Sequence, residues 1–276
     1  MNMSRAKSHK TIILPEDHPR FFLHWFLEIY DARSVLYALV VRDVKVRYKH
    51  TLLGVLWVVL QPVAMLAIFH AVFSNIYQNA DYLIYAMAGL VAWQWISFAT
   101  THAAQSLDRE SNLITKIYFP RVIVPLASVL SASIDFTISL VVLVLLIVMK
   151  LGSINVSGLS MLFGILTTFL LSASVGCLLS YLNVLFKDVR YALPFLTQVW
   201  FFATPIVYPL SSVPRSILPA MQCNPAIIPI EFLRSALLPG YEIKYDLSLA
   251  WIVMFAIFAM GLVVFKKTEF MLAEKV

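Results

Sequence analysis

Charged side chains are scarce in this chain. Only 13% of its 276 residues are Asp, Glu, Lys or Arg, whereas 61% are hydrophobic. A soluble domain carries about 25% charged residues. The chain therefore has too little polar surface to cover a water-soluble globule, and its composition predicts a protein that crosses a membrane several times.

Motifs for metal, cofactor and nucleotide chemistry are also missing. Cys177 lies in an apolar run and Cys223 in a proline-rich loop, so the two cysteines have no metal-ligand spacing and predict no disulfide. The chain has no Gly-Lys dipeptide, and hence no G-x-x-x-x-G-K-[ST] phosphate loop. No clustered His, Asp or Cys set suits a metal or a nucleophile. These absences argue against a catalytic residue, a bound cofactor, a metal and an integral-membrane enzyme.

The N-terminal region lacks the core of a signal peptide. Its first twenty residues contain no apolar run of seven before acidic residues and proline interrupt it. Residues 1–30 are therefore expected to form a cytoplasmic tail. Nine of the 21 Lys and Arg residues precede Thr51, and such an excess marks the cytoplasmic side of a membrane protein. Topology thus explains the net charge of +6, which implies no nucleic-acid partner.

Residues 31–51 have the pattern of an amphipathic helix. One apolar face repeats every four residues and consists of Leu36, Val40, Val44 and Tyr48. The cations of this segment are Arg42, Lys45, Arg47 and Lys49, of which Arg42, Lys45 and Lys49 recur on another face. Such a helix lies in the plane of anionic headgroups. No turn signal precedes the apolar stretch from Leu52, so the helix is expected to lead straight into a membrane span.

Apolar runs between chain breakers predict six membrane-spanning helices. Their ranges are about 52–73, 83–103, 124–149, 159–182, 193–209 and 249–265. The fold class is therefore an all-α polytopic membrane protein, with residues 52–276 as one transmembrane domain. With six spans both termini lie on one side, and most Lys and Arg residues then fall in the cytoplasm.

The segment at about 210–240 is too apolar for an ordinary loop. Seven of the 13 prolines lie between Thr204 and Gly240. Broken backbone is tolerated near membrane depth where protein or a water-filled path satisfies it. Short re-entrant or interfacial helices on the outer face are therefore expected, although the segment could also be a lid that only packs over the spans.

Four blocks of the sequence resemble one family. They are RDVKVRYKHTLLGVLWVVLQP at 42–62, LITKIYFPRVIVPLA at 113–127, LNVLFKDVRYALPFLTQVWFFATPIVYP at 182–209 and NPAIIPIEFLRSALL at 224–238. From about Asp31 to the C-terminus the chain is similar to the membrane subunit of ABC-2 type exporters of polysaccharides and polyol phosphates, most of all the O-antigen permeases. The resemblance implies a homodimer in the bacterial inner membrane, two copies of a cytoplasmic ATPase subunit that binds ATP and magnesium, and a channel for a lipid-linked glycan.

The resemblance also implies that two cytoplasmic loops, 106–121 and 186–191, transmit force from the ATPase. The candidate coupling residues are Asp108, Arg109, Glu110, Lys116, Lys187, Asp188 and Arg190. A plainer interpretation is that these charges only anchor the topology of the chain.

A glycan path through lipid needs aromatic platforms and neutral hydrogen-bonding groups. The spans offer Trp57, Gln61, Phe69, Trp93, Gln94, Gln198, Trp200, Phe201 and Tyr208 as candidate lining residues. Aromatic residues in spans also form interfacial belts or face lipid. The three glutamines are the more informative candidates, because an amide in hydrocarbon costs free energy unless it finds a partner or water.

Three ionisable residues stand apart from the loops. Asp135 lies within the predicted third span, where a carboxylate costs roughly 2.5–3.5 kcal/mol. It is expected either to pair inside the bundle or to lie on the substrate path, and proton coupling is an alternative. Glu231 and Arg234 are three residues apart under the outer face and could pair on one helical face.

Two other transport functions compete with glycan export. An ABC exporter of drugs, haem or lipids would share the six spans and the separate ATPase. An ion-coupled carrier would need several intramembrane acids and a repeat of spans. The sequence shows only Asp135 and no convincing repeat.

Overall fold

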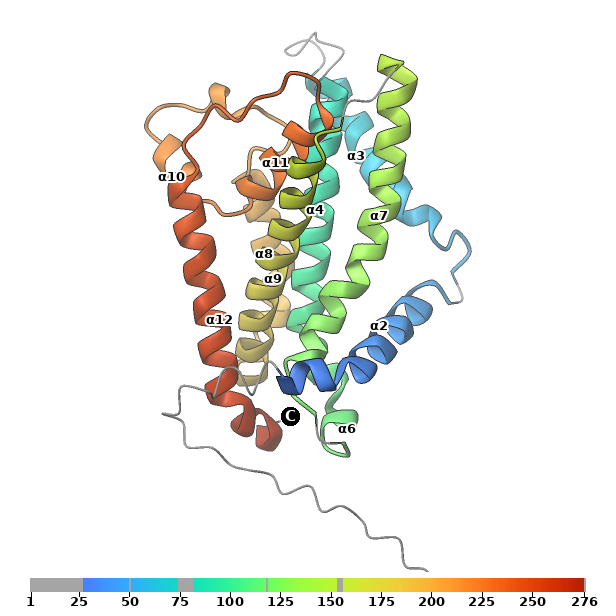
Figure 1. Cartoon of the computed structure of the whole chain (residues 1–276), viewed down its shortest axis with the longest axis vertical. Helices are drawn as coiled ribbons and strands as arrows, with labels where there is room; N and C mark the ends of the chain where they lie inside the picture. Colours follow the sequence, from blue (N-terminus) through green and yellow to red (C-terminus); the bar gives the residue numbers. More distant parts are fainter. Residues whose placement is uncertain (1–26, 50, 74–81, 118, 153–155, 276) are drawn as a thin grey trace, which may run out of the picture.

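The computed structural model describes residues 27–49, 51–73, 82–117, 119–152 and 156–275 (Figure 1). These residues form helices and connecting loops, with no β-strand among them. Of the predicted cytoplasmic tail at 1–30, residues 1–26 lie outside the described part.

Helices form most of the described part of the chain. They are α2 (Arg33–Tyr48), α3 (Leu56–Phe73), α4 (Tyr82–Ala104), α5 (Ser106–Arg109), α6 (Ser111–Ile114), α7 (Ile123–Leu151), α8 (Gly158–Leu185), α9 (Val189–Phe202), the 3-10 helix η1 (Leu210–Ser212), α10 (Leu218–Gln222), α11 (Ile227–Leu237) and α12 (Ser248–Lys275). Within the described ranges, four helices are long and apolar enough to cross a membrane: Tyr82–Ala104, Ile123–Lys150, Gly158–Leu185 and Ser248–Lys266. Leu56–Val72 is a shorter apolar helix.

Helix α4 forms the centre of the bundle. It packs against α7 and α8 along its length, and also against α3, α9 and α11. Its contact surface is rich in small residues, with Ala86, Ala88, Ala92 and Ala99 fully buried. Small side chains let helix backbones approach closely, which is how helices associate without a hydrophobic driving force in lipid. The centre of α4 is therefore held in place from several sides.

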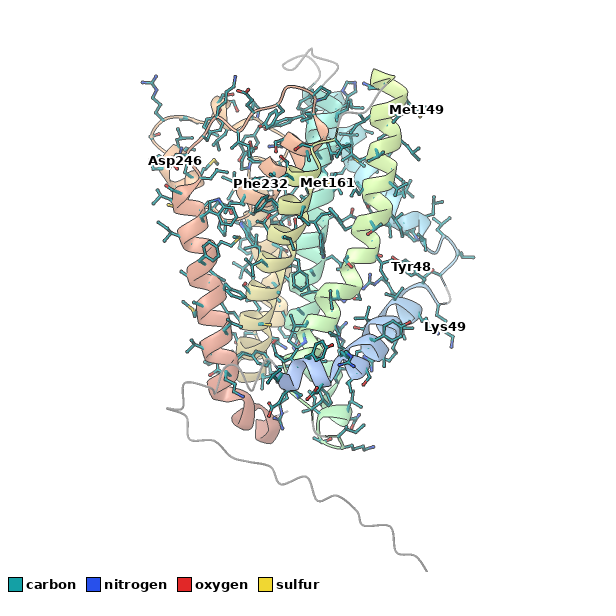
Figure 2. The ribbon with its side chains drawn as sticks, in the orientation of Figure 1. Tyr48, Lys49, Met149, Met161, Phe232 and Asp246 are labelled. Atoms are coloured by element: carbon teal, nitrogen blue, oxygen red, sulfur yellow. The ribbon has the colours of Figure 1, made fainter. Side chains whose placement is uncertain are left out.

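Helix α2 lies obliquely across α7 at one end of the bundle (Figure 1). Leu39 is buried there, and the predicted apolar face from Leu36 to Tyr48 is half-buried. Lys45 and Lys49 are exposed, and Lys49 points away from the bundle (Figure 2). The helix does not lead straight into α3, however. Gly54 adopts a φ of 49°, a left-handed conformation that suits glycine, and this turn separates the two helices.

Different elements lie at the two ends of the bundle. Helices α2, α5 and α6, the start of α9 and the end of α12 gather at one end, which holds the described loops predicted to be cytoplasmic (Figure 1). Helices α10 and α11 and the loop before α12 lie toward the other end, where Asp246 is also located (Figure 2). The predicted outer-face segment thus contains short helices at the end opposite the inner loops.

The predicted fifth span has the wrong boundaries. It was expected at 193–209, whereas α9 covers Val189–Phe202 and has 14 residues. Proline disfavours helical backbone in the residue before it, and Pro205 follows closely after the last turn of α9. At about 1.5 Å per residue, 14 residues extend about 21 Å, less than the hydrocarbon core of about 30 Å. Helix α9 alone therefore does not cross a membrane.

Candidate functional site

A groove of about 730 Å³ lies between α3, α4 and α9. Five of the predicted lining residues meet there, namely Gln61, Trp93, Gln94, Gln198 and Phe201. Because each helix contributes one of the three glutamines, the groove combines amide groups that are far apart in the sequence.

Helical spacing explains which side of α9 faces the groove. Pro194, Thr197, Gln198 and Phe201 recur at intervals of three or four residues and line it. Trp200 lies on another face and donates its indole N–H to Asn224 Oδ1 at 2.9 Å. Gln198 and Phe201 therefore face the groove, whereas Trp200 between them does not.

Four predicted lining residues lie outside this groove. Trp57 lines a neighbouring cavity, and Phe69 stacks on Phe201 with ring centroids 6.1 Å apart. Trp200 bonds to Asn224, and the Tyr208 hydroxyl donates to the Phe202 carbonyl at 2.8 Å. Sequence reasoning missed Ser97, Phe98, Thr101 and Thr197, which also line the groove. The first three continue the face of Gln94 along α4 at helical spacing, which would have identified them.

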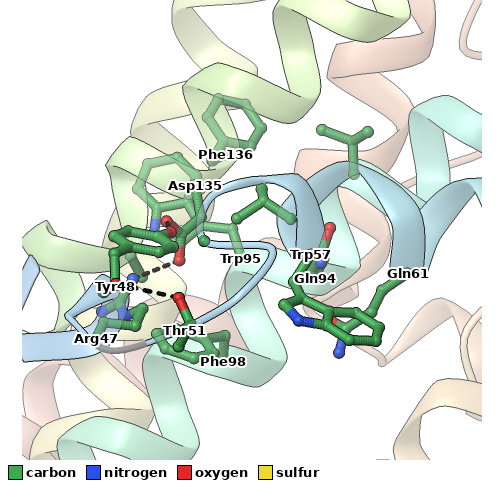
Figure 3. Close-up of a pocket in the computed structure, with 14 residues that line it drawn as sticks. Arg47, Tyr48, Thr51, Trp57, Gln61, Gln94, Trp95, Phe98, Asp135 and Phe136 are labelled. Atoms are coloured by element: carbon green, nitrogen blue, oxygen red, sulfur yellow. Dashed lines mark hydrogen bonds and ion pairs between the residues drawn. The ribbon is translucent and has the colours of Figure 1, made fainter.

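A second cavity, of about 230 Å³, lies where α2 approaches α3, α4 and α7 (Figure 3). Asp135 lies in its wall and forms an ion pair with Arg47 and a hydrogen bond with the Tyr48 hydroxyl. Arg47 also donates to Ser131 Oγ at 2.9 Å and lies 4.2 Å above the Phe98 ring. Asp135 is thus paired inside the bundle, and Arg47 and Tyr48 both face inward, whereas Val46 is exposed.

The surroundings of Tyr48 fix its protonation state. Burial, with the nearby Asp135 carboxylate as a smaller cause, raises the pKa of Tyr48 to about 12. The phenol therefore stays protonated at physiological pH and can donate a hydrogen bond to Asp135. One carboxylate in α7 thus receives bonds from two consecutive residues of α2.

Asp108 connects the two predicted coupling loops. Its carboxylate contacts Lys187 Nζ at 2.7 Å, Arg190 Nη2 at 3.7 Å and the Asn183 amide at 3.0 Å. Asp108 belongs to α5, whereas these partners lie from the end of α8 to the start of α9. The structure therefore joins loops that are more than seventy residues apart in sequence.

The next residues of the first loop contact other elements. Glu110 accepts two bonds from Arg42 of α2, at 2.5 and 2.7 Å. The hydrogen bond with Glu110 is the main cause that raises the pKa of Arg42.

Arg109 donates to the His102 carbonyl at 2.9 Å and to Ser128 Oγ at 3.4 Å. Lys116 and Asp188 are exposed. We name the contacts of Arg42, Asp108, Glu110 and Lys187 the inner charge network.

The predicted pair of Glu231 and Arg234 forms within α11. The Arg234 guanidinium contacts Glu231 Oε1 at 2.8 Å, and both side chains are almost fully buried, at 0% and 3% exposure. Arg234 also donates to the Ile206 carbonyl at 2.6 Å and lies 3.5 Å from the centroid of the Tyr85 ring. The Tyr241 hydroxyl donates to the other Glu231 oxygen at 2.8 Å. The pair therefore holds α11, α4 and two loops together, and we call it the outer buried pair.

Asn224 connects α9 to α11. Its side-chain oxygen accepts from the Trp200 indole and from the backbone N–H of Ala226 at 3.1 Å. Its amide nitrogen donates to the Ala203 carbonyl at 3.1 Å and to Thr204 Oγ1 at 2.8 Å. One side chain thereby satisfies backbone groups on both sides of the chain reversal.

The described residues hold no cluster of three or more His, Cys, Asp and Glu side chains that could bind a metal ion. The arrangement instead consists of a polar aromatic groove within the bundle and ion pairs at its two ends. These features suit the binding of a ligand in the groove and a movement of the helices relative to one another.

Residues 34–238 match the family model of ABC-2 type transporters. The chain is similar to an O-antigen export system permease protein of Myxococcus xanthus, with 30% identity over 67% of this chain and 72% of that protein. It is also similar to an O-antigen export system permease protein of Klebsiella pneumoniae, with 26% identity over 84% of this chain and 91% of that protein. A polysialic acid transport protein of Escherichia coli shows 24% identity over 84% of this chain and 92% of that protein.

Proposed function

Because the chain belongs to the ABC-2 type transporter family, we propose that it is the permease subunit of an ATP-driven exporter of a lipid-linked polysaccharide. It would act in the inner membrane of a bacterium, as a homodimer with two copies of a separate ATPase subunit. The permeases for O-antigen and polysialic acid to which it is similar support this substrate class. The observation that carries the proposal is the groove that collects three glutamines and several aromatic rings between α3, α4 and α9.

The proposed orientation places α2 and the inner charge network in the cytoplasm. Six spans then follow as α3, α4, α7, α8, α9 and α12, with the residues after α9 completing the fifth crossing. The outer buried pair would lie toward the outer face, with α11 as a re-entrant helix. Support comes from the common location of the described basic loops at one end of the bundle, since cytoplasmic loops carry an excess of Lys and Arg.

The groove would bind the sugar chain during its passage. A sugar has apolar C–H faces that pack on aromatic rings such as Trp93 and Phe201, and hydroxyl groups that bond to amides. Gln94 Oε1 is buried and has no hydrogen-bond partner in the part of the chain that the structure describes. An unsatisfied buried acceptor costs roughly 1–3 kcal/mol, and a sugar hydroxyl would remove that cost.

The inner charge network would transmit the ATPase motion. Asp108 links the first inner loop to the base of α9, and Glu110 links the same loop to α2. When ATP closes the ATPase pair, a push on 106–121 would therefore move α9 and α2 together. Since α9 forms one wall of the groove, this movement would widen it.

The experiment that tests the function is deletion of the gene in its own bacterium, in a strain without a second exporter. Lipid-linked glycan inside the cell is compared with polymer at the surface. We expect accumulation inside and loss outside, both restored by the intact gene. Normal surface polymer without internal accumulation would overturn the function and favour export of a drug or a lipid.

A further inference from the structure

The groove between α3, α4 and α9 has polar side chains, and the described residues give it no fixed charge. Among these residues its lining contains three glutamines, Ser97, Thr101, Thr197 and His102, and includes no Asp, Glu, Lys or Arg. A groove that served only to face lipid tails would not need this set, because each amide without a partner costs free energy in hydrocarbon. The lining is therefore specialised for a polar ligand that carries no charge.

The nearby ionic groups are separated from the groove. The ion pair of Arg47 and Asp135 lies in the second cavity (Figure 3). Gln61, Gln94 and Phe98 belong to the walls of both spaces. Within that pair the two charges neutralise each other. Arg109 contacts the groove lining through His102, whose carbonyl it bonds at 2.9 Å and whose ring atom Nδ1 lies 3.2 Å from its guanidinium. A ligand in the groove would thus meet amides and aromatic rings before any ion.

Charge on the polymer decides how well it fits such a lining. A carboxylate or phosphate that loses water costs several kcal/mol unless a cation or several hydrogen-bond donors replace that water. Sugar hydroxyls need only neutral partners, which three glutamines supply as both donors and acceptors. Membership of the family does not decide whether the polymer is charged, because one similar protein is named for polysialic acid, an acidic polymer.

We propose that the glycan exported by this permease has uncharged repeat units, without uronic acid, sialic acid or phosphate. This inference rests on the proposed function and narrows its substrate class. Gln61, Gln94 and Gln198 would bind the hydroxyl groups of the neutral sugars, while Trp93, Phe98 and Phe201 pack against their C–H faces.

The first test uses the polymer that accumulates in the deletion strain. Mild acid releases the glycan from its lipid, so that the phosphate of the carrier is excluded, and the free polymer is applied to an anion exchanger and analysed for sugar composition. A polymer that passes through unbound, with neutral sugars only, supports the inference. A polymer that binds and contains acidic repeats overturns it but leaves the proposed function standing. Absence of any accumulated polymer overturns the proposed function itself.

The second test changes the glutamines in the complete exporter. Gln61→Leu, Gln94→Leu and Gln198→Leu should each lower the rate of polymer appearance at the surface about threefold to tenfold, the effect of one lost hydrogen bond. The matched control is Gln222→Leu, because Gln222 lies in α10 outside the groove. Protein amount in the membrane is measured for each variant. Export at the wild-type rate by all three groove variants, at equal protein amount, would overturn the inference.

Discussion

The ion pairs at the two ends of the bundle are built for different tasks. In the inner charge network, Lys187 and Asp108 keep 50% and 22% of their side-chain surface exposed, whereas Arg234 and Glu231 of the outer buried pair keep 0% and 3%. Exposed pairs contribute little to stability and can separate at small cost. A buried pair cannot lose one partner without leaving an unpaired charge. The ion pair of α11 is thus suited to stay closed, whereas the ion pair between Asp108 and Lys187 can open at small cost.

Arg234→Met should have the largest effect on stability. It leaves the Glu231 carboxylate buried with only Tyr241 as a described partner, and the loss of one member of a buried pair costs about 3–5 kcal/mol. The measurement is the midpoint of thermal unfolding of the purified protein in detergent. The control is Arg190→Met, at the exposed end. Equal unfolding midpoints for the two variants would show that the buried pair stabilises the protein no more than the exposed pair does.

A double variant tests whether the unpaired Glu231 charge causes this loss of stability. Glu231→Leu combined with Arg234→Met removes both charges, and apolar replacement of a whole buried pair is often neutral. We expect the double variant to recover much of the stability lost in Arg234→Met. If it is the less stable of the two, the cost does not come from the unpaired charge.

Gly89→Ala should have the next largest effect. A Cβ at this position would lie 2.7 Å from the Ile206 carbonyl oxygen and 3.0 Å from Arg234 Nη2. Overpacking of this kind costs about 1–3 kcal/mol. The same substitution at Gly158, where nothing lies within 4 Å, provides the matched control. The unfolding midpoint should fall for Gly89→Ala alone, and an equal fall in both would mean that the close approach is unimportant.

Asp135→Asn tests a site between the two extremes, since Arg47 and Asp135 keep 18% and 15% of their side-chain surface exposed. We expect a loss of about 1–3 kcal/mol, because the Arg47 guanidinium keeps a neutral partner in place of an ion. Thr137→Val, on the exposed side of α7, is the control. An unchanged midpoint together with normal export would show that this ion pair does not hold α2 against α7.

Asp108→Asn should have the smallest effect on stability, below about 1 kcal/mol. If the inner charge network transmits force, the same variant should nevertheless lose most ATP-dependent export while still binding the ATPase. The measurements are the unfolding midpoint, co-purification of the ATPase and the amount of surface polymer.

Exchange of the two charges provides the control for this pair. Asp108→Lys combined with Lys187→Asp keeps an ion pair between the loops, so it should restore part of the export that Asp108→Lys alone abolishes. Full export by Asp108→Asn would contradict the role in coupling, whatever the double variant does.

A local pattern in the sequence predicted the pair of Glu231 and Arg234, which lies within a single helix. The spacing of three between Glu231 and Arg234 was enough to predict their contact. Their burial was not predictable, because it depends on Tyr85 and Ile206, which approach from other parts of the chain. The same holds for Asp135, whose partner Arg47 is 88 residues away and was assigned to the headgroups.

For the neutral side chains of the groove, too, contacts between distant parts of the chain were not predictable from the sequence. The residue types of Gln61, Gln94 and Gln198 marked them as candidates, since amides are costly in lipid. That they meet in one space follows from how α3 and α9 pack against α4, which no local pattern encodes. The end of α9 was misplaced because an apolar run continued through Pro205, where the helix had already stopped.

Asn224 has a consequence for the chemical lifetime of the protein. Asparagine deamidates when the backbone nitrogen of the next residue attacks the side-chain carbonyl and closes a five-membered ring. The next residue here is Pro225, whose nitrogen carries no hydrogen and is already substituted. The side chain that connects α9 to α11 by four hydrogen bonds is thereby protected from the commonest form of asparagine ageing.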